Sequence, residues 1–294
     1  VNGIPIKRAV ELFGILNIVC FSPEDLSIIK NGPAERRRFM DMELSQLDKI
    51  YLSNLINYNK VVNQRNKLLK ELSFKSSEEK LETLDIWDLQ LVKYGTEVMK
   101  RRVGFVQELN EIIGGLHEKL SGGTEKLTIE YQPCVEETTF LDTVTKMRER
   151  DLRMKSTCFG PHKDDLIFFI NGSEVKKYGS QGQQKSFLIA LKLAQYAVVA
   201  QTKGERPILL LDDLFDKLDA GRVEQLIRLV SDDTFGQILI TDCNPTRLKR
   251  ILDKAGGDYT LFSVAEGAVT QERAAAEDPA EGPAGNAAEN AANT

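Results

Sequence analysis

Apolar residues recur at near-heptad spacing through the first half of the chain. Two series are separated by a polar break at 73–79, and they run through Leu44, Leu47, Tyr51, Tyr58, Val61, Leu68 and Leu72, and then through Leu84, Trp87, Leu91, Tyr94, Val98, Val106, Leu109, Ile113 and Leu116. This period predicts amphipathic helices that pack along their lengths. The polar break between them predicts an antiparallel helical arm, with Asn54 and Arg65 on its apolar seam.

Shorter apolar runs predict strands in the rest of the chain. Residues 127–131 alternate between apolar and polar side chains, and residues 166–170 lead into Asn171-Gly172, a dipeptide typical of hairpin turns. Residues 208–211 and 238–241 are mainly aliphatic, which is typical of buried parallel strands.

Helix-period patterns over 140–154 and from about 180 to 203 alternate with these strands. Alternating strands and helices predict an α/β domain. We therefore expect an α/β head built from residues 1–32 and 125–272, with residues 33–124 inserted as the helical arm.

The C-terminal residues differ in composition from the rest of the chain. From Ala274 onward there are four acidic residues, no Lys or Arg, and no large apolar side chain. Such a segment buries too little surface to fold, so residues 273–294 are expected to form a disordered acidic tail. The formal net charge is −5, and it becomes −1 without the four acids of the tail. Any contact with DNA must therefore come from local basic patches.

Cysteine usage and hydropathy indicate a cytoplasmic protein. Cys20, Cys134, Cys158 and Cys243 lie without C-x-x-C spacing, and only two histidines accompany them. A zinc site or a disulfide framework is not expected, and scattered thiols are typical of a reducing compartment. No apolar stretch approaches the ~20 residues that span a bilayer, and no signal peptide is visible.

The most specific chemistry lies in a turn that opens a predicted helix. Residues 178–185 read YGSQGQQK. Ser180 offers a hydroxyl group, and Gly182 has no side chain to keep a phosphate away from the backbone. The unpaired N–H groups at the positive end of the helix favour an anion. The sequence therefore predicts a nucleotide-phosphate site formed by Ser180, Gln181, Gly182 and Gln183.

A second element of the same chemistry follows the next strand. The aliphatic run 208–211 ends in Asp212-Asp213, and ligands of α/β sheets collect at the carboxyl ends of strands. We assign Asp212 to Mg²⁺, and Asp213 to the orientation or deprotonation of an attacking water, as catalytic base. Asp219 ends the segment FDKLD, which resembles the loop after the second carboxylate in ABC-type ATPases, and it is expected to contact the nucleotide.

Each element has a simpler interpretation. Ser180 and Gln183 have the spacing of a capping box, and an aliphatic strand that ends in acids is often just a strand meeting the N-terminus of a helix. A Ser-x-Gly-Gln turn followed in order by a strand with two terminal carboxylates is, however, typical of ATPases that bind nucleotide between two subunits. The order of the elements favours the functional interpretation.

The chain resembles the RecF family of DNA replication and repair proteins. The resemblance rests on segments spread from near residue 1 to about residue 270: FSPEDL at 21–26, GP at 32–33, RRRFMD at 36–41, WD at 87–88, GPHKDDL at 160–166, YGSQGQQK at 178–185 and LLLDDL at 209–214. It implies an SMC/ABC-like ATPase head with a short arm, binding of ATP and Mg²⁺, and an ATP-dependent homodimer. It also implies binding to double-stranded or gapped DNA, and action with RecO and RecR in loading RecA.

One departure from the family concerns the main phosphate loop. No G-x-x-x-x-G-K-[ST] segment occurs in the 294 residues. In the family this loop lies near the N-terminus, and the chain opens with Val1, so we expect that its first part is missing and that this chain alone does not turn over ATP. ABC ATPases often place a sensor His where Thr241 or Asp242 stands, which predicts slow hydrolysis in the complete protein.

Three basic patches are candidates for DNA contact: Arg36-Arg37-Arg38, Lys100-Arg101-Arg102, and the run Lys146, Arg148, Arg150, Arg153 and Lys155. Each interleaves with apolar residues of helical period, so a solvated helix face is the alternative. We rank Arg36, Arg37 and Arg38 first, because they open a helix that springs from the head, and the Arg148 group second.

Two other functions are compatible with the motifs. One is an ABC/SMC-type DNA-repair ATPase outside the RecF family, RecN-like or linked to a nuclease, for which a much longer arm or a nuclease domain would be expected. The other is a non-enzymatic DNA-binding dimerisation module in which Asp212 and Asp213 are structural.

Overall fold

The computed structural model describes residue 5 and residues 15–73, 77–123, 125–213, 220–231, 234–255 and 259–272. The chain divides into two compact units, residues 1–255 and residues 256–294. The second unit contains a two-stranded antiparallel hairpin of β7 (Leu261–Ala265) and β8 (Ala268–Glu272). The predicted tail 273–294 lies outside the described residues.

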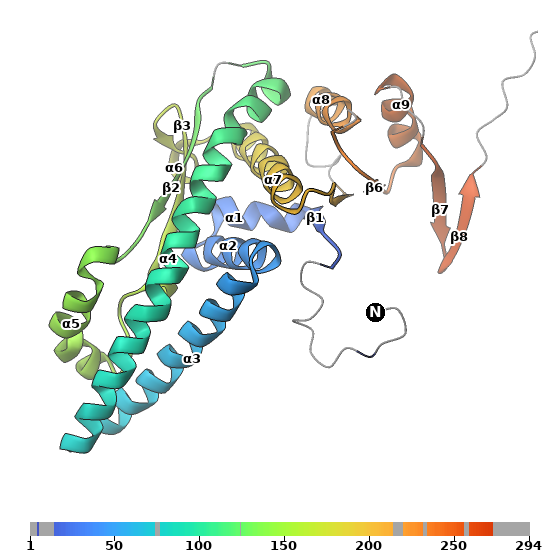
Figure 1. Cartoon of the computed structure of the whole chain (residues 1–294). Coiled ribbons are helices and arrows are strands. Elements are labelled where there is room, and N and C mark those ends of the chain that lie inside the picture. The colour runs from blue at the N-terminus through green and yellow to red at the C-terminus, as the bar shows by residue number, and fades with distance from the viewer. Residues whose placement is uncertain are drawn as a thin grey trace, which may run out of the picture. The chain divides into compact units, whose positions relative to one another are not determined.

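The first unit contains two small sheets and the helices around them (Figure 1). Its strands are β1 (Ile18–Phe21), β2 (Leu127–Gln132), β3 (Asp165–Ile170), β4 (Ser173–Glu174), β5 (Ile208–Asp212) and β6 (Ile238–Thr241). Its helices are α1 (Leu26–Lys30), α2 (Pro33–Leu47), α3 (Lys49–Leu72), α4 (Glu78–Ser121), α5 (Phe140–Met154), α6 (Val175–Tyr178), α7 (Gln181–Lys203), α8 (Ala220–Val230) and α9 (Pro245–Ala255).

The parallel sheet has the strand order β1-β5-β6. Ile18 is in register with Ile208, and Leu209 with Ile238, so the three strands end at the same edge. Asp212 pairs with Thr241 at that edge. The aliphatic runs predicted to be strands are therefore the sheet, and its carboxyl edge carries the predicted acidic pair.

The antiparallel sheet has the order β2-β3-β4, with the Asn171-Gly172 turn between β3 and β4. Asn171 has φ 49° and Gly172 φ 76°, the left-handed pair that a tight hairpin requires and that Asn and Gly tolerate best. The sequence prediction of a strand entering a hairpin is confirmed here.

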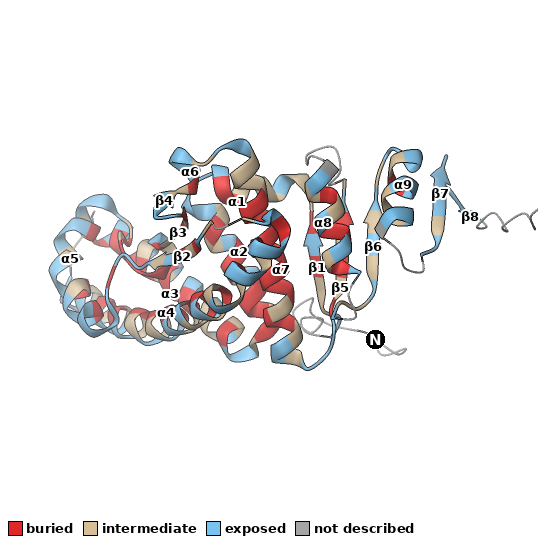
Figure 2. Cartoon of the chain, turned by 90° about the horizontal axis from the view of Figure 1, so that it is seen from above, coloured by how far each residue is buried: buried red, intermediate tan, exposed pale blue. Residues whose placement is uncertain are grey.

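Helix α7 forms the centre of the unit's core. Almost every residue from Ser186 to Val199 is buried, including the polar Lys192 and Gln195. Figure 2 shows α7 mostly in the colour of buried residues. It packs against α4 on one side and against α1, α2 and β1 on others. A helix buried all round needs an apolar surface in every direction, which explains the run FLIALKLAQYAVV.

Within the predicted arm, residues 33–124, α3 and the first part of α4 pack side by side, and α5 lies against them (Figure 1). Arg65 falls on the seam as expected and is fully buried. Helix α4 does not stop at the arm, since its later turns pack against α7 and β2 of the head. The residues predicted as arm, 33–124, therefore contain a helix that belongs to both parts. In the described part of the chain, no helix is long and apolar enough to cross a membrane.

Candidate functional site

The Ser180 turn, residues 179–184, opens α7 with a complete capping box. Ser180 Oγ accepts a hydrogen bond from the backbone N of Gln183 at 3.2 Å, and Gln183 Oε1 accepts one from the backbone N of Ser180 at 2.9 Å. Gly179 is required here, because a Cβ atom would lie 2.5 Å from the carbonyl oxygen of Val175. The structure therefore contains the cap that the simpler interpretation describes.

The cap leaves the chemistry of the turn intact. Because Ser180 Oγ is the acceptor of its cap bond, its own O–H remains a donor, and the residue is exposed. Gln181 is also exposed, and Gly182 is half-buried. Exposed donors at the N-terminus of a 23-residue helix suit an oxyanion. The same residues can therefore form the capping box and still present donors to an anion.

Three residues at this turn were missed from the sequence. Glu125 Oε1 accepts a hydrogen bond from Gln183 Nε2 at 2.8 Å, and Glu125 Oε2 lies 3.6 Å from Nε2 of the buried His117. Burial lowers the pKa of His117, against the opposing charge of Glu125. The guanidinium of Arg222 lies over Gly182, where a Cβ would be 3.1 Å from it. No local pattern marks Glu125 or Arg222, since Glu125 lies 58 positions from Gln183 and Arg222 lies 40 positions from Gly182.

Asp212 and Asp213 lie at the carboxyl edge of the parallel sheet, as predicted. Thr241 Oγ1 donates a hydrogen bond to Asp212 Oδ1 at 2.5 Å. The backbone N of Asp213 lies 3.3 Å from both the carbonyl oxygen and Oγ1 of Thr241. Asp213 has φ 47°, a left-handed conformation that is uncommon outside glycine but most accessible to Asn and Asp. The residue at the expected sensor position thus orients the carboxylate predicted to hold the metal.

The donor set at this edge fits a magnesium ion. Carboxylate and hydroxyl oxygens are hard ligands, and Mg²⁺ is commonly held by one or two carboxylates together with substrate phosphates and water. Asp212 Oδ2 accepts no hydrogen bond from a described residue. In the described part of the chain no group of three or more His, Cys, Asp or Glu converges on a common metal position, so Asp212 and Asp213 would supply only part of the coordination shell. Asp219 lies outside the described residues.

No hydrogen bond or ion pair between described residues joins the Ser180 turn to Asp212 or Asp213. Within one chain the turn contacts Glu125, and the acidic pair contacts Thr241. Among the described residues, the two predicted halves of the nucleotide site are therefore separate hydrogen-bonded clusters.

The predicted DNA-binding arginines divide into two groups. Arg36 is buried and forms a bidentate pair with Asp165, at 2.7 and 2.9 Å. Arg148 contacts Asp85 and Asp88 at 2.5 and 2.6 Å. Both guanidinium groups therefore neutralise carboxylates of the chain, and this geometry argues against their prediction as free DNA contacts.

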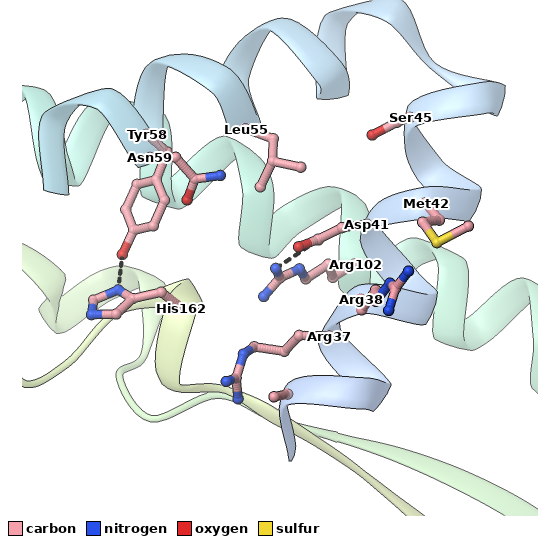
Figure 3. Close-up of a pocket in the computed structure, with 11 residues that line it drawn as sticks. Arg37, Arg38, Asp41, Met42, Ser45, Leu55, Tyr58, Asn59, Arg102 and His162 are labelled. Carbon is pink, nitrogen blue, oxygen red and sulfur yellow. Dashed lines mark hydrogen bonds and ion pairs between the residues drawn. The ribbon is translucent and has the colours of Figure 1, made fainter. Parts of the chain in front are cut away.

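Arg37 and Arg38 have a different environment. Arg38 is exposed and Arg37 half-buried, and neither forms an ion pair with a described residue. Arg37 donates a hydrogen bond to the carbonyl oxygen of Asp164 at 2.8 Å. Both line a pocket of about 490 Å³ between α2, α3 and the Pro161–Lys163 turn (Figure 3).

Arg102, Tyr58 and His162 of this pocket have hydrogen-bond or ion-pair partners within the chain. Arg102 is paired with Asp41 at 2.8 Å. His162 Nε2 donates to the carbonyl oxygen of Thr157 at 3.1 Å, so His162 Nδ1 accepts from the Tyr58 hydroxyl at 2.7 Å (Figure 3). Burial lowers the pKa of His162, which keeps it neutral at pH 7. The uncompensated positive charge of the pocket therefore comes from Arg37 and Arg38.

Comparison with known proteins is decisive for the family. A search of protein-family models gives no match. The chain is 53% identical over 272 residues to the DNA replication and repair protein RecF of Lachnospira eligens, and this alignment covers 92% of the chain and 73% of the relative. It is 43% identical over 265 residues to RecF of Bacteroides thetaiotaomicron, with 90% and 71% covered. The chain belongs to the RecF family.

Solved RecF structures have the same fold. The structure described as the recombination mediator protein RecF-ATP in the RecFOR pathway superposes with a TM-score of 0.79 at 31% identity, covering 92% of this chain and 72% of that one. The corresponding RecF-ATPrS structure gives a TM-score of 0.78 at the same identity. The α/β head with its inserted helical arm is therefore the RecF fold, as the sequence motifs predicted.

Proposed function

We propose that the protein binds ATP and Mg²⁺ between two copies of itself and acts on DNA in recombinational repair. The observation that carries the proposal is the Ser180 turn, which presents an exposed hydroxyl donor and helix N-terminal amides and, among the described residues, forms no hydrogen bond with Asp212 or Asp213. RecF relatives and the ATP complex of a RecF protein support the choice of nucleotide.

Each half of the site has its own role in this proposal. Ser180 donates a hydrogen bond to the terminal phosphate of ATP held by the partner subunit, and the amides of Gln181, Gly182 and Gln183 add positive potential. Asp212, which accepts a hydrogen bond from Thr241, would hold the metal ion, and Asp213 would accept a proton from the attacking water or orient it. Bound Mg²⁺ would offset the negative charge of the phosphates. Because Ser180 binds only nucleotide on the partner, ATP couples the two copies.

DNA is the macromolecular partner in this proposal, with Arg37 and Arg38 as phosphate contacts. Their guanidinium groups have no carboxylate partner among the described residues, which supports them over Arg36 and Arg148. Cooperation with RecR and RecO is proposed on the strength of a related RecF structure described as part of the RecFOR pathway.

Ser180→Arg tests the nucleotide-bridged dimer. In the full-length protein, the bulky side chain blocks the approach to the partner's phosphate, so ATP should still bind each monomer while ATP-dependent dimerisation and hydrolysis are lost. Light scattering with and without ATP measures the assembly. If Ser180 is only a cap, the substitution costs about 1 kcal/mol of stability and leaves assembly unchanged.

Ser77→Arg is the matched control, because Ser77 is the exposed N-cap of α4 and accepts from Lys80 N. It removes a cap of the same type at a different helix, so it should lower stability by a similar amount without affecting assembly. A Ser180→Arg protein that forms dimers with ATP as the parent does would refute the proposed role of Ser180.

A further inference from the structure

The side-chain amide of Gln183 has a fixed orientation. Its Oε1 accepts from Ser180 N at 2.9 Å, while its Nε2 donates to Glu125 Oε1 at 2.8 Å. Glu125 in its carboxylate form only accepts hydrogen bonds. If the amide rotated by 180°, its NH₂ group would face the Ser180 N–H and its oxygen would face the carboxylate. Glu125 therefore decides which end of Gln183 meets the backbone of Ser180.

The orientation of Gln183 in turn holds the conformation of Ser180. The two hydrogen bonds of the capping box are reciprocal, so the Ser180 backbone is tied to the Gln183 side chain and the Ser180 hydroxyl to the Gln183 backbone. With one lone pair occupied by Gln183 N, the Ser180 hydroxyl keeps its own hydrogen available as a donor. Loss of the outer hydrogen bond would free the turn to adopt other rotamers.

Glu125 is itself attached to the end of the arm helix. It follows α4 by four residues, and its second oxygen lies 3.6 Å from Nε2 of His117, a fully buried ring in the last turns of α4. That nitrogen has no hydrogen-bond partner in the described structure. Burial of an imidazole nitrogen without a polar neighbour is costly, so the Glu125 carboxylate 3.6 Å away is favoured in its present position. The same helix packs along α3 at its other end.

We propose that Glu125 is a positioning residue that holds the Ser180 turn in its nucleotide-facing conformation and connects it to the end of α4. The side chains of Gln183, Glu125 and His117 form a series of contacts that joins α4 to the surface that meets the partner's nucleotide. This inference rests on the proposed function for its consequence in assembly, but its structural part concerns one chain without nucleotide.

Amide hydrogen exchange of the 294-residue chain tests the structural part. In Glu125→Ala the exchange of the Ser180 and Gln183 amides should become about tenfold faster, the effect of losing one hydrogen bond of ordinary strength. Glu125→Gln keeps an acceptor oxygen for Gln183 Nε2 and should restore exchange close to the parent rate. Glu130→Ala, at an exposed position of β2, is the matched control and should leave the turn unchanged.

ATP-dependent self-association of the full-length protein tests the functional part. Glu125→Ala should need about tenfold more protein for half-maximal dimerisation, while Glu125→Gln assembles near the parent concentration. Unchanged exchange at Ser180 and Gln183 in Glu125→Ala, or an equal increase in Glu130→Ala, overturns the positioning role. Faster exchange with unchanged assembly overturns the connection to nucleotide. Failure of the proposed function itself would appear separately, as a Ser180→Arg protein that still dimerises.

Discussion

Glu43 is a buried carboxyl group between the head and the base of the arm. It lies on α2, is 6% exposed, and faces Lys192 and Gln195 of α7, with Asp25 also nearby. Burial raises its pKa to about 7, although the positive charge of Lys192 opposes the shift. Near neutral pH this residue is therefore close to the midpoint of its own titration.

The raised pKa predicts that stability falls as pH rises. The folded chain binds a proton at Glu43 more tightly than the unfolded chain, in which the pKa of this carboxyl is near 4.5. As the pH rises above 4.5, ionisation of Glu43 therefore favours the unfolded state, and this loss of stability levels off above the folded pKa. Between pH 5 and 8 this residue should cost about 2 kcal/mol of unfolding free energy. Glu43→Gln, which mimics the protonated form, should remove that part of the pH dependence.

Urea unfolding of parent and variant across this range measures the effect, and Glu149→Gln, at an exposed position of α5, is the control. If the parent and Glu43→Gln lose stability equally between pH 5 and 8, Glu43 does not ionise in this window.

At the scale of single residues, the sequence predicts what local chemistry determines. The cap at Ser180 and the acids after β5 follow from residues a few positions apart. The environment of Arg36 does not, because its carboxylate partner lies 129 residues away. The contact between Glu125 and Gln183 cannot be predicted from the sequence either, since only folding brings the two residues together. Long-range partners are set by packing, and a single sequence contains no local signal for them.

At the scale of helices, a buried ionic cluster joins α3, α4 and α5. Arg65 donates to Asp88 Oδ1 and to Asp151 Oδ2, both at 2.6 Å, and to Thr157 Oγ1 at 2.9 Å. Arg65 and Asp151 are fully buried. The heptad pattern predicts the packing of the two long helices but presents Arg65 only as an imperfection of the seam. The structure shows it as a buried contact between α5 and the arm, beside the pairs that Arg148 of α5 forms with Asp85 and Asp88.

Arg65→Met should therefore destabilise the unit strongly. Removing the guanidinium leaves the Asp151 carboxylate buried without its ionic partner, and breaking such pairs costs about 3–5 kcal/mol. Equilibrium unfolding in denaturant measures the loss. Arg153→Met is the control, because Arg153 is exposed and its ion pair with Glu149 is long, at 4.0 Å. This substitution should lower the unfolding free energy by less than about 0.5 kcal/mol.

A second variant separates charge from packing. Arg65→Met combined with Asp88→Leu and Asp151→Leu removes the whole cluster, and it should recover much of the stability lost by Arg65→Met alone. A single Arg65→Met variant as stable as the Arg153→Met control would mean that the cluster does not hold the arm together.

At the scale of the whole molecule, the order of motifs predicts the architecture better than its boundaries. The head, the arm and the parallel strands follow from hydrophobic period. The strand order β1-β5-β6 does not, because β1 at Ile18–Phe21 pairs with β5, which begins only at Ile208. The sequence pattern also does not predict that α4 belongs to both arm and head. Its apolar stripe is continuous, but it packs against α3 in the arm and against α7 and β2 in the head.

The charge distribution of the molecule gives the last prediction. The net charge is −5, so binding to DNA must rely on a few well-placed cations and not on overall attraction. Arg37→Ala with Arg38→Ala should weaken binding of gapped duplex DNA and reduce the slope of log affinity against log salt by about two, one counterion for each lost phosphate contact. Arg228→Ala with Arg250→Ala removes the same charge from exposed positions of α8 and α9.

Fluorescence anisotropy of labelled DNA between about 50 and 200 mM salt measures the slope of log affinity against log salt for each double variant. If DNA binding depended only on net charge, the slope would fall equally in the Arg37/Arg38 and Arg228/Arg250 double variants, because long-range attraction does not distinguish the positions of the arginines. A local phosphate contact at the pocket of Figure 3 would flatten the slope of the Arg37 and Arg38 variant alone. If that variant keeps the parent slope, these two arginines face solvent and the DNA surface lies elsewhere.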